Sequence, residues 1–181
     1  MRDKYILTAE SVTEGHPDKL CDTIADSVLD ACLKNDPTAH VACEAMATAG
    51  KIIVAGEITV RELPDIPAIV CRTVRETDYG SDYEVEVITH DQSGDIAGAV
   101  SQDAQTGAGD QGIMYGYACN ETVELLPLPV VLAHRLTSLL TNTRRTGTIR
   151  GLGPDGKAQV SVEYVSGIPQ PDQRHCGLLP A

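Results

Sequence analysis

A histidine and a carboxylate meet at a predicted helix start near the N-terminus. Pro17 has no N–H group to leave unpaired in a first helical turn, and Asp18 follows where free N–H groups favour negative charge. His16 directly precedes this turn. Such a helix end attracts phosphate, and a carboxylate beside it could hold a hard cation such as Mg²⁺ against that phosphate. A capped, solvent-exposed helix start fits the same residues, so this short motif alone leaves both interpretations open.

Two longer runs favour the chemical interpretation. Residues 10–22, ESVTEGHPDKLCD, closely resemble the first signature of the S-adenosylmethionine synthetases (methionine adenosyltransferases), and residues 107–118, GAGDQGIMYGYA, resemble the second. Shorter segments with the same resemblance are residues 42–44, 54–59, 133–136 and 154–157. The resemblance covers roughly residues 3–165.

This resemblance implies a reaction and its cofactors. The family forms S-adenosylmethionine from ATP and methionine and releases phosphate and pyrophosphate. Since a whole triphosphate leaves, the site must hold a polyanion, which Mg²⁺, K⁺ and basic side chains would do. The family also implies a homo-oligomer, either a dimer or a dimer of dimers.

The resemblance assigns a role to individual residues of this sequence. His16 matches the catalytic histidine that contacts the triphosphate, Asp18 the magnesium ligand and Glu44 the potassium ligand. The residues implied to bind methionine are Glu57, Gln92 and Asp110, and those implied to bind ATP are His16, Asp155, Gly156 and Lys157.

Most of these residues also have a structural explanation. Glu44 and Glu57 fall in predicted strands, where a carboxylate usually lies on the solvent face. Because Gly56 precedes Glu57, close approach of the backbone to a ligand is an alternative. Asp110 fits an exposed turn, and residues 154–157 fit an ordinary Pro-Asp-Gly turn followed by an exposed lysine.

The sequence also departs from the family pattern. Gly94 and Ala99 replace a proline and a glycine in the segment that corresponds to the family's mobile lid. Family members continue for about as long again, whereas here the pattern fades over residues 166–181, a stretch with little capacity to form a core. We therefore expect an N-terminal domain at 1–95, part of the lid at 96–108, and a truncated central domain at 109–181.

Two rival functions remain open at this point. One is a noncatalytic fragment or regulatory subunit that pairs with a complete synthetase. The other is a magnesium-dependent phosphohydrolase that uses only His16 and Asp18.

Composition narrows the classes of partner. The 181 residues carry 26 acidic and 14 basic side chains, a formal charge of −12, which argues against nonspecific binding to nucleic acid or to anionic membranes. The chain is 42% hydrophobic but has no Phe or Trp, so aliphatic residues and Tyr must fill its core. Six cysteines without CxxC spacing predict reduced thiols, and no leader or long apolar run is evident, so we expect a cytoplasmic location.

Hydrophobic periodicity predicts the elements that would position these residues. It indicates helices over residues 18–34, 65–76 and 129–142, and strands over residues 41–48, 51–59, 83–89 and 158–164. Residues 90–112 show no sustained period and are rich in glycine. The pattern predicts an α+β fold, with helices packed on a mostly antiparallel sheet, and the resembled family's fold is of that kind.

Overall fold

The chain folds into two units, and in each of them the described helix or helices pack on one face of a sheet. The computed structural model describes residues 3–80, 83–92 and 113–180. One unit consists of Met1–His16 with Tyr115–Ala181, and the other of Pro17–Met114. By contacts, the first 16 residues thus group with the C-terminal part of the chain. The division at 1–95, 96–108 and 109–181 remains a prediction about the domain limits of the family.

The Pro17–Met114 unit has a mixed sheet with the strand order β2-β3-β4. Its elements are α1 (Pro17–Asn35), β2 (His40–Thr48), β3 (Lys51–Thr59), α2 (Ile66–Glu76) and β4 (Glu84–His90). Strands β2 and β3 form the predicted antiparallel hairpin, whereas β3 and β4 are parallel. Parallel neighbours need a crossover connection, and α2 supplies it.

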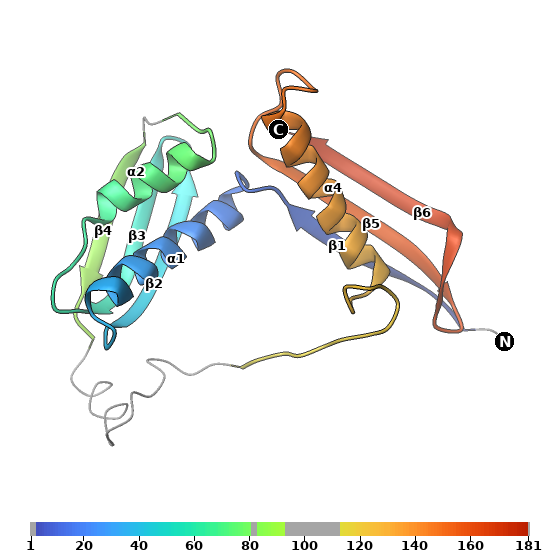
Figure 1. The fold of residues 1–181 in the computed structure, drawn as a ribbon, viewed down its shortest axis with the longest axis horizontal. Coiled ribbons are helices and arrows are strands. Elements are labelled where there is room, and N and C mark those ends of the chain that lie inside the picture. The colour runs from blue at the N-terminus through green and yellow to red at the C-terminus, as the bar shows by residue number, and fades with distance from the viewer. Residues whose placement is uncertain (1–2, 81–82, 93–112, 181) are drawn as a thin grey trace. The chain divides into compact units, whose positions relative to one another are not determined.

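Both helices of this unit pack on the same face of its sheet (Figure 1). Helix α1 buries a stripe at the spacing of one helix face, and β3 presents alternate residues to it. The buried side chains from these two elements are Leu20, Ile24, Val28, Cys32, Ile52, Val54 and Ile58. The opposite face of the sheet carries no helix among the described residues, and there Met46 and Ile88 are more than half exposed.

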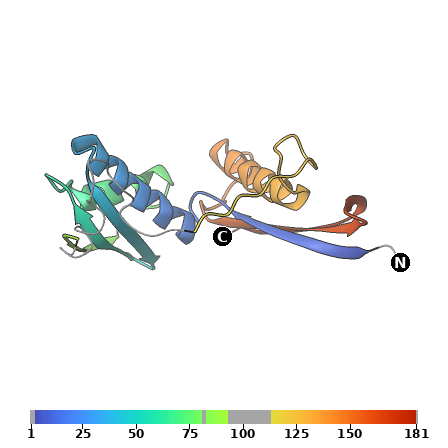
Figure 2. The same ribbon diagram turned by 90° about the horizontal axis from the view of Figure 1, so that it is seen from below.

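The other unit has an antiparallel sheet with the strand order β1-β5-β6. Its elements are β1 (Lys4–Val12), α4 (Leu128–Arg145), β5 (Gly156–Val165) and β6 (Ile168–Pro180). Helix α4 lies along one face of this sheet (Figure 2), where Ala133 packs against Val160, Val162 and Tyr164. The ring of Tyr5 stacks on that of Tyr164 with the centroids 5.1 Å apart.

The structure confirms the predicted α+β fold with mostly antiparallel sheets. The three described helices each begin and end within a few residues of the predicted limits, and so do the four predicted strands. Strand β1 was not predicted. Only its last three residues fall in the first signature motif, and residues 4–9 were given no element, although Tyr5, Leu7 and Ala9 alternate along the strand on the side that faces α4.

Residues 168–180 form an edge strand, in the stretch for which the sequence predicted little capacity to form a core. Ser166 and Gly167 both have positive φ, 53° and 78°, as the two-residue turn of a hairpin requires. Val165 and Ile168 are therefore paired across the turn, and β6 returns along β5. An edge strand pairs through its backbone on one side only, so Pro169 is tolerated there.

Two further observations concern the described chain as a whole. No helix among the described residues is long and apolar enough to span a bilayer. Among the described side chains, Cys21, Cys32, Cys43, Cys71 and Cys119 form no disulfide bond. Burial raises the pKa of Cys43, which packs against the α1 core, to about 11, so this thiol stays protonated near neutral pH.

Candidate active site

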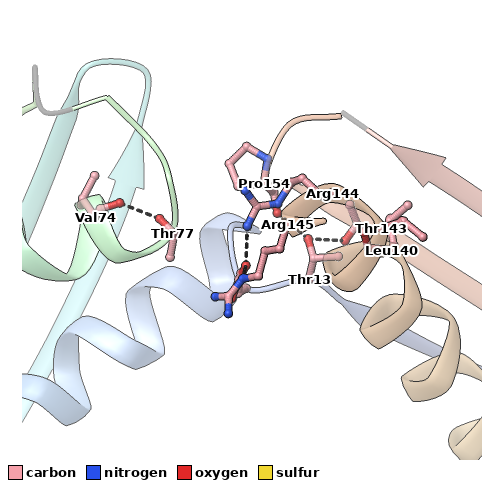
Figure 3. A network of polar contacts seen from close by, with 10 residues as sticks. Thr13, Val74, Thr77, Leu140, Thr143, Arg144, Arg145 and Pro154 are labelled. Carbon is pink, nitrogen blue, oxygen red and sulfur yellow. Dashed lines mark hydrogen bonds and ion pairs between the residues drawn. The ribbon is translucent and has the colours of Figure 1, made fainter. Parts of the chain in front are cut away.

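The turn that carries His16 is held against the segment before β5. Thr13 is buried; its N–H donates to the Gly156 carbonyl over 2.9 Å and its hydroxyl to the Pro154 carbonyl over 2.7 Å. The Gly15 N–H donates to the same Pro154 oxygen over 3.2 Å. Figure 3 shows this cluster, with Thr13 and Pro154 labelled. Two segments about 140 residues apart in sequence thus lie together in one unit.

This packing explains one of the glycines assigned to the ATP site. A Cβ atom at Gly156 would lie 2.7 Å from Cδ2 of Leu140 and 3.3 Å from Cγ2 of Thr13. The buried start of β5 therefore has no room for a side chain. Asp155, directly before it, is half-buried.

His16 and Asp18 stand on either side of the boundary between the two units. The His16 N–H donates to the Thr13 carbonyl over 3.1 Å, which closes the turn, and α1 begins at Pro17 as predicted. Asp18 is the acidic residue of the first helical turn and is exposed. Since Asp18 comes two residues after His16, the chain itself keeps their Cα atoms within about 7 Å.

Asp18 lines an open cavity of about 320 Å³ in the Pro17–Met114 unit. Asp22, one helical turn later, lines the same cavity, and residues 45–47 of β2 form another part of its wall. One or two carboxylates completed by phosphate oxygens and water are the usual ligands of Mg²⁺. The donor set at this helix start therefore fits that ion. Among the described residues, no group of three or more His, Cys, Asp or Glu side chains is arranged to hold a metal ion.

Lys157 lies near the start of β5 and forms an ion pair with Glu10 of β1. Its Nζ atom is 2.8 Å from Oε2 of Glu10, and the amide of Gln159 donates to Oε1 of the same carboxylate over 2.8 Å. The hydrogen bond and the charge of Lys157 lower the pKa of the Glu10 carboxyl. Glu10 is therefore ionised near neutral pH and holds the lysine at the sheet.

Glu44 and Glu57 lie on the face of the β2-β3-β4 sheet that points away from the helices. In the register of the hairpin, Glu44 is opposite Ala55 and Glu57 is opposite Ala42, so the two carboxylates are diagonal neighbours. Glu44 is exposed, and Glu57 has a third of its side chain exposed. A carboxylate oxygen is also a suitable ligand for a hard monovalent cation, so Glu44 is compatible with K⁺.

Two of the three residues predicted to bind methionine lie at the same end of one sheet. Oε1 of Glu57 is 3.5 Å from Nε2 of His90, at the end of the neighbouring strand β4. The Gln92 N–H donates to Oγ1 of Thr59, two residues after Glu57, over 3.0 Å. Glu57 and Gln92 thus share one end of this sheet. Asp110, Gly94 and Ala99 lie outside the described residues.

Sequence reasoning missed the partners of these residues. Glu10, Glu14 and His90 were not assigned a role, although each contacts or adjoins a predicted site residue. The alternation of β1 was a usable signal for Glu10, because it places Glu10 and Lys157 on the same face once β1 pairs with β5. The contact of Glu14 with α4 has no local signal in the sequence.

Comparison with known proteins identifies the family of the chain. Residues 4–104 match the family model of the S-adenosylmethionine synthetase N-terminal domain, and residues 105–175 match that of the central domain. The S-adenosylmethionine synthase of Solidesulfovibrio magneticus is 48% identical over 178 residues, and that of Oleidesulfovibrio alaskensis is 49% identical. Each match covers 93% of this chain and 46% of the relative, so the chain spans about half the length of these relatives. The two consecutive domain matches, together with the identity to these synthases, show that the chain belongs to the S-adenosylmethionine synthetase family, a family of enzymes.

Proposed function

We propose that this chain takes part in the methionine adenosyltransferase reaction. In that reaction the sulfur of methionine attacks C5′ of the ATP ribose, S-adenosylmethionine forms, and the triphosphate leaves and is hydrolysed to phosphate and pyrophosphate. The observation that carries the proposal is the contact between the turn before His16 and the segment that ends at Lys157. These are the two places at which the sequence resembles the family's ATP site.

The ATP side of the site would use four residues. His16 donates a hydrogen bond to the triphosphate near the bond that breaks, where negative charge grows in the transition state. Lys157 offers a point charge that suits phosphate, and a bound triphosphate would compete for it with Glu10, now 2.8 Å away. Asp155 and the backbone of Gly156 border the same place.

Two cations complete the proposal. Asp18 would hold Mg²⁺ together with phosphate oxygens, and Glu44 would hold K⁺. When bound, these ions neutralise part of the charge of the leaving triphosphate. Methionine would be bound by Glu57, Gln92 and Asp110, since carboxylates are suitable partners for its ammonium group.

The proposed role of Asp18 as a ligand of Mg²⁺ can be tested by calorimetry. We expect Mg²⁺ to tighten the binding of a nonhydrolysable ATP analogue to the wild-type chain much more than to the Asp18→Asn variant. Asp30→Asn is the matched control, because Asp30 is an exposed aspartate on the same helix away from the helix start. An equal effect of Mg²⁺ on the wild type and on Asp18→Asn would refute the proposed role of Asp18.

A regulatory subunit is the second candidate function. The face of the β2-β3-β4 sheet that carries no helix among the described residues, with exposed Met46 and Ile88, favours pairing with another protein chain. A homo-oligomer and a cytoplasmic location belong to the first proposal and stay predictions. The test adds this chain to a complete S-adenosylmethionine synthase. A change in the rate of S-adenosylmethionine formation, or in the size of the synthase assembly, would favour the regulatory role.

A further inference from the structure

We propose that Glu14 is a positioning residue: held by Arg144 and Arg145 at the end of α4, it sets the place of His16 for contact with a triphosphate. This inference rests on the proposed function, in which His16 is the donor to that group. Glu14 itself does not touch the substrate in this scheme. It acts through the turn that it shares with His16.

Two guanidinium groups contact the one carboxylate. Nη2 of Arg144 is 2.5 Å from Oε1 of Glu14. Arg145 binds both oxygens, Nε to Oε1 over 3.1 Å and Nη2 to Oε2 over 2.6 Å. The Arg144 side chain is only 10% exposed, so Glu14 supplies the countercharge for a largely buried cation. Such charge-assisted, bidentate contacts define direction as well as distance.

The backbone on both sides of Glu14 is held as well. Thr13 and Gly15 bond the Pro154 carbonyl, and the His16 N–H closes the turn onto the Thr13 carbonyl. One side of the turn thus lies against the segment before β5. The Glu14 carboxylate ties the turn to α4, and His16 follows only two residues later.

Helix α4 is held in place by its packing on the sheet and not by the contact of its arginines with Glu14. Ala133 and Thr137 are buried between the helix and its sheet, and the two arginines occupy its last turn, where the helix dipole favours cations. Helix α4 is therefore a fixed support, and Arg144 and Arg145, labelled in Figure 3, transmit its position to the turn. If the Glu14 charge is removed, the turn loses this support and the imidazole of His16 moves.

The experiment compares Glu14→Gln with a matched control, Glu124→Gln. Glu124 forms the same kind of ion pair, 2.7 Å from Nη2 of Arg135 on α4, but has no contact with the His16 turn among the described residues. We measure the imidazole resonances of His16 by NMR, assigned with His16→Gln, and the binding of inorganic tripolyphosphate with Mg²⁺ by calorimetry. Glu14→Gln should shift the His16 resonances and weaken binding about tenfold, whereas Glu124→Gln should do neither.

The two readouts separate this inference from the proposed function. Unmoved His16 resonances and unchanged binding in Glu14→Gln overturn the positioning role, even if the melting temperature falls. If the wild-type chain does not bind tripolyphosphate, the proposed ATP site fails, and the His16 resonances alone then decide on Glu14. If Glu14→Gln does not fold, Arg145→Gln removes the exposed arginine and keeps the Arg144 contact, and it must shift the same resonances or the inference fails.

Discussion

Gly56 lies where two strands approach too closely for a side chain. Its φ is +145°, and a Cβ atom there would be 2.0 Å from the carbonyl oxygen of Ala42 on β2. The glycine before Glu57 thus serves the close approach of a neighbouring strand. We expect Gly56→Ala to lower the free energy of unfolding by about 2–4 kcal/mol, since strain and overpacking add.

A second glycine of the same hairpin provides the control. Gly50 also has a positive φ, +73°, but a Cβ atom there would meet nothing within 4 Å. Gly50→Ala should therefore cost only the backbone conformation, about 1 kcal/mol. Chemical unfolding of both variants measures the difference. Equal costs would show that β2 gives way to the new methyl group.

The Asp36 carboxylate links two loops, and its hydrogen bonds should make the stability of the fold depend on pH. Oδ1 accepts from the hydroxyl and the N–H of Thr38 over 2.7 and 3.0 Å, and Oδ2 accepts from the Arg61 N–H over 3.2 Å. These bonds, above all that from the Thr38 hydroxyl, lower the pKa of Asp36. The Asp36 carboxylate therefore stabilises the folded state at pH values above the pKa of an aspartate in the unfolded chain, near 4. This stabilisation is lost as the pH falls through the lower pKa that Asp36 has in the folded state.

The measurement is thermal unfolding of Asp36→Asn against the wild type between pH 7 and pH 2. We expect the variant to melt at a lower temperature at pH 7, and the gap to close as the wild-type carboxyl becomes protonated below about pH 4. Asp30→Asn, an exposed change on the preceding helix, should show no such pH-dependent gap. A gap that persists unchanged at pH 2 would contradict a role for the Asp36 charge.

The start of α4 depends on a hydrogen-bonded pair between two elements. The Tyr164 hydroxyl of β5 donates to Oε2 of Glu121 over 2.7 Å, and that oxygen also accepts from the Leu128 N–H at the first turn of α4 over 3.0 Å. Burial and the neighbouring Glu121 charge raise the pKa of Tyr164, so its hydroxyl remains a donor. Tyr164→Phe should therefore cost about 1.5–3 kcal/mol, as expected for a hydrogen bond to a charged group.

Tyr5→Phe is the matched change on the facing ring. Tyr5 stacks on Tyr164 at 5.1 Å but is 43% exposed, and no hydrogen bond of its hydroxyl is seen within the described chain. Loss of the Tyr5 hydroxyl group should change the free energy of unfolding by less than about 0.5 kcal/mol. Denaturant unfolding followed by circular dichroism measures both variants. If both cost the same, the stacked rings, and not the bond to Glu121, would account for the effect.

The elements that the sequence predicted are those defined by local signals. Pro17 and the stripe from Leu20 to Cys32 lie within one helix, so their spacing alone predicts α1. Strands β1 and β6 both pair with β5, and β1 does so across more than 140 residues. No local window of sequence contains that pairing. The Ser166-Gly167 turn was a local signal for β6, but the proline-containing stretch after it indicated only little capacity to form a core.

The candidate site follows the same rule. His16, Asp18 and Lys157 could be assigned from motifs, because each motif is a short contiguous run. Their partners could not, since Glu10 meets Lys157 only through strand register and Glu14 meets the arginines only through the packing of α4. The motifs thus indicate which residues would carry the proposed chemistry, and the fold shows which neighbours contact them.

The balance of charge over the chain bears on catalysis. The sequence has 14 basic residues against 26 acidic ones. In the described part of the chain, at least seven of the basic side chains already form ion pairs with carboxylates: Lys4, Lys51, Arg61, Arg135, Arg144, Arg145 and Lys157. At least half of the basic residues are therefore already paired with carboxylates, and a triphosphate would have to compete with Glu10 for Lys157.

We accordingly expect the 181-residue chain by itself to make no S-adenosylmethionine at an enzymatic rate. Loss of one good charge-stabilising donor typically costs about 3–4 kcal/mol, or roughly a hundred- to a thousandfold in rate, and this chain spans 46% of the length of its relatives. The test incubates the purified chain with ATP, methionine, Mg²⁺ and K⁺ and follows the product by mass spectrometry. The Solidesulfovibrio magneticus synthase, assayed in parallel, shows that the conditions support the reaction. Product formed at about one turnover per second or faster, in a preparation free of host synthase, would contradict the prediction and show that His16, Asp18 and Lys157 with their present neighbours suffice.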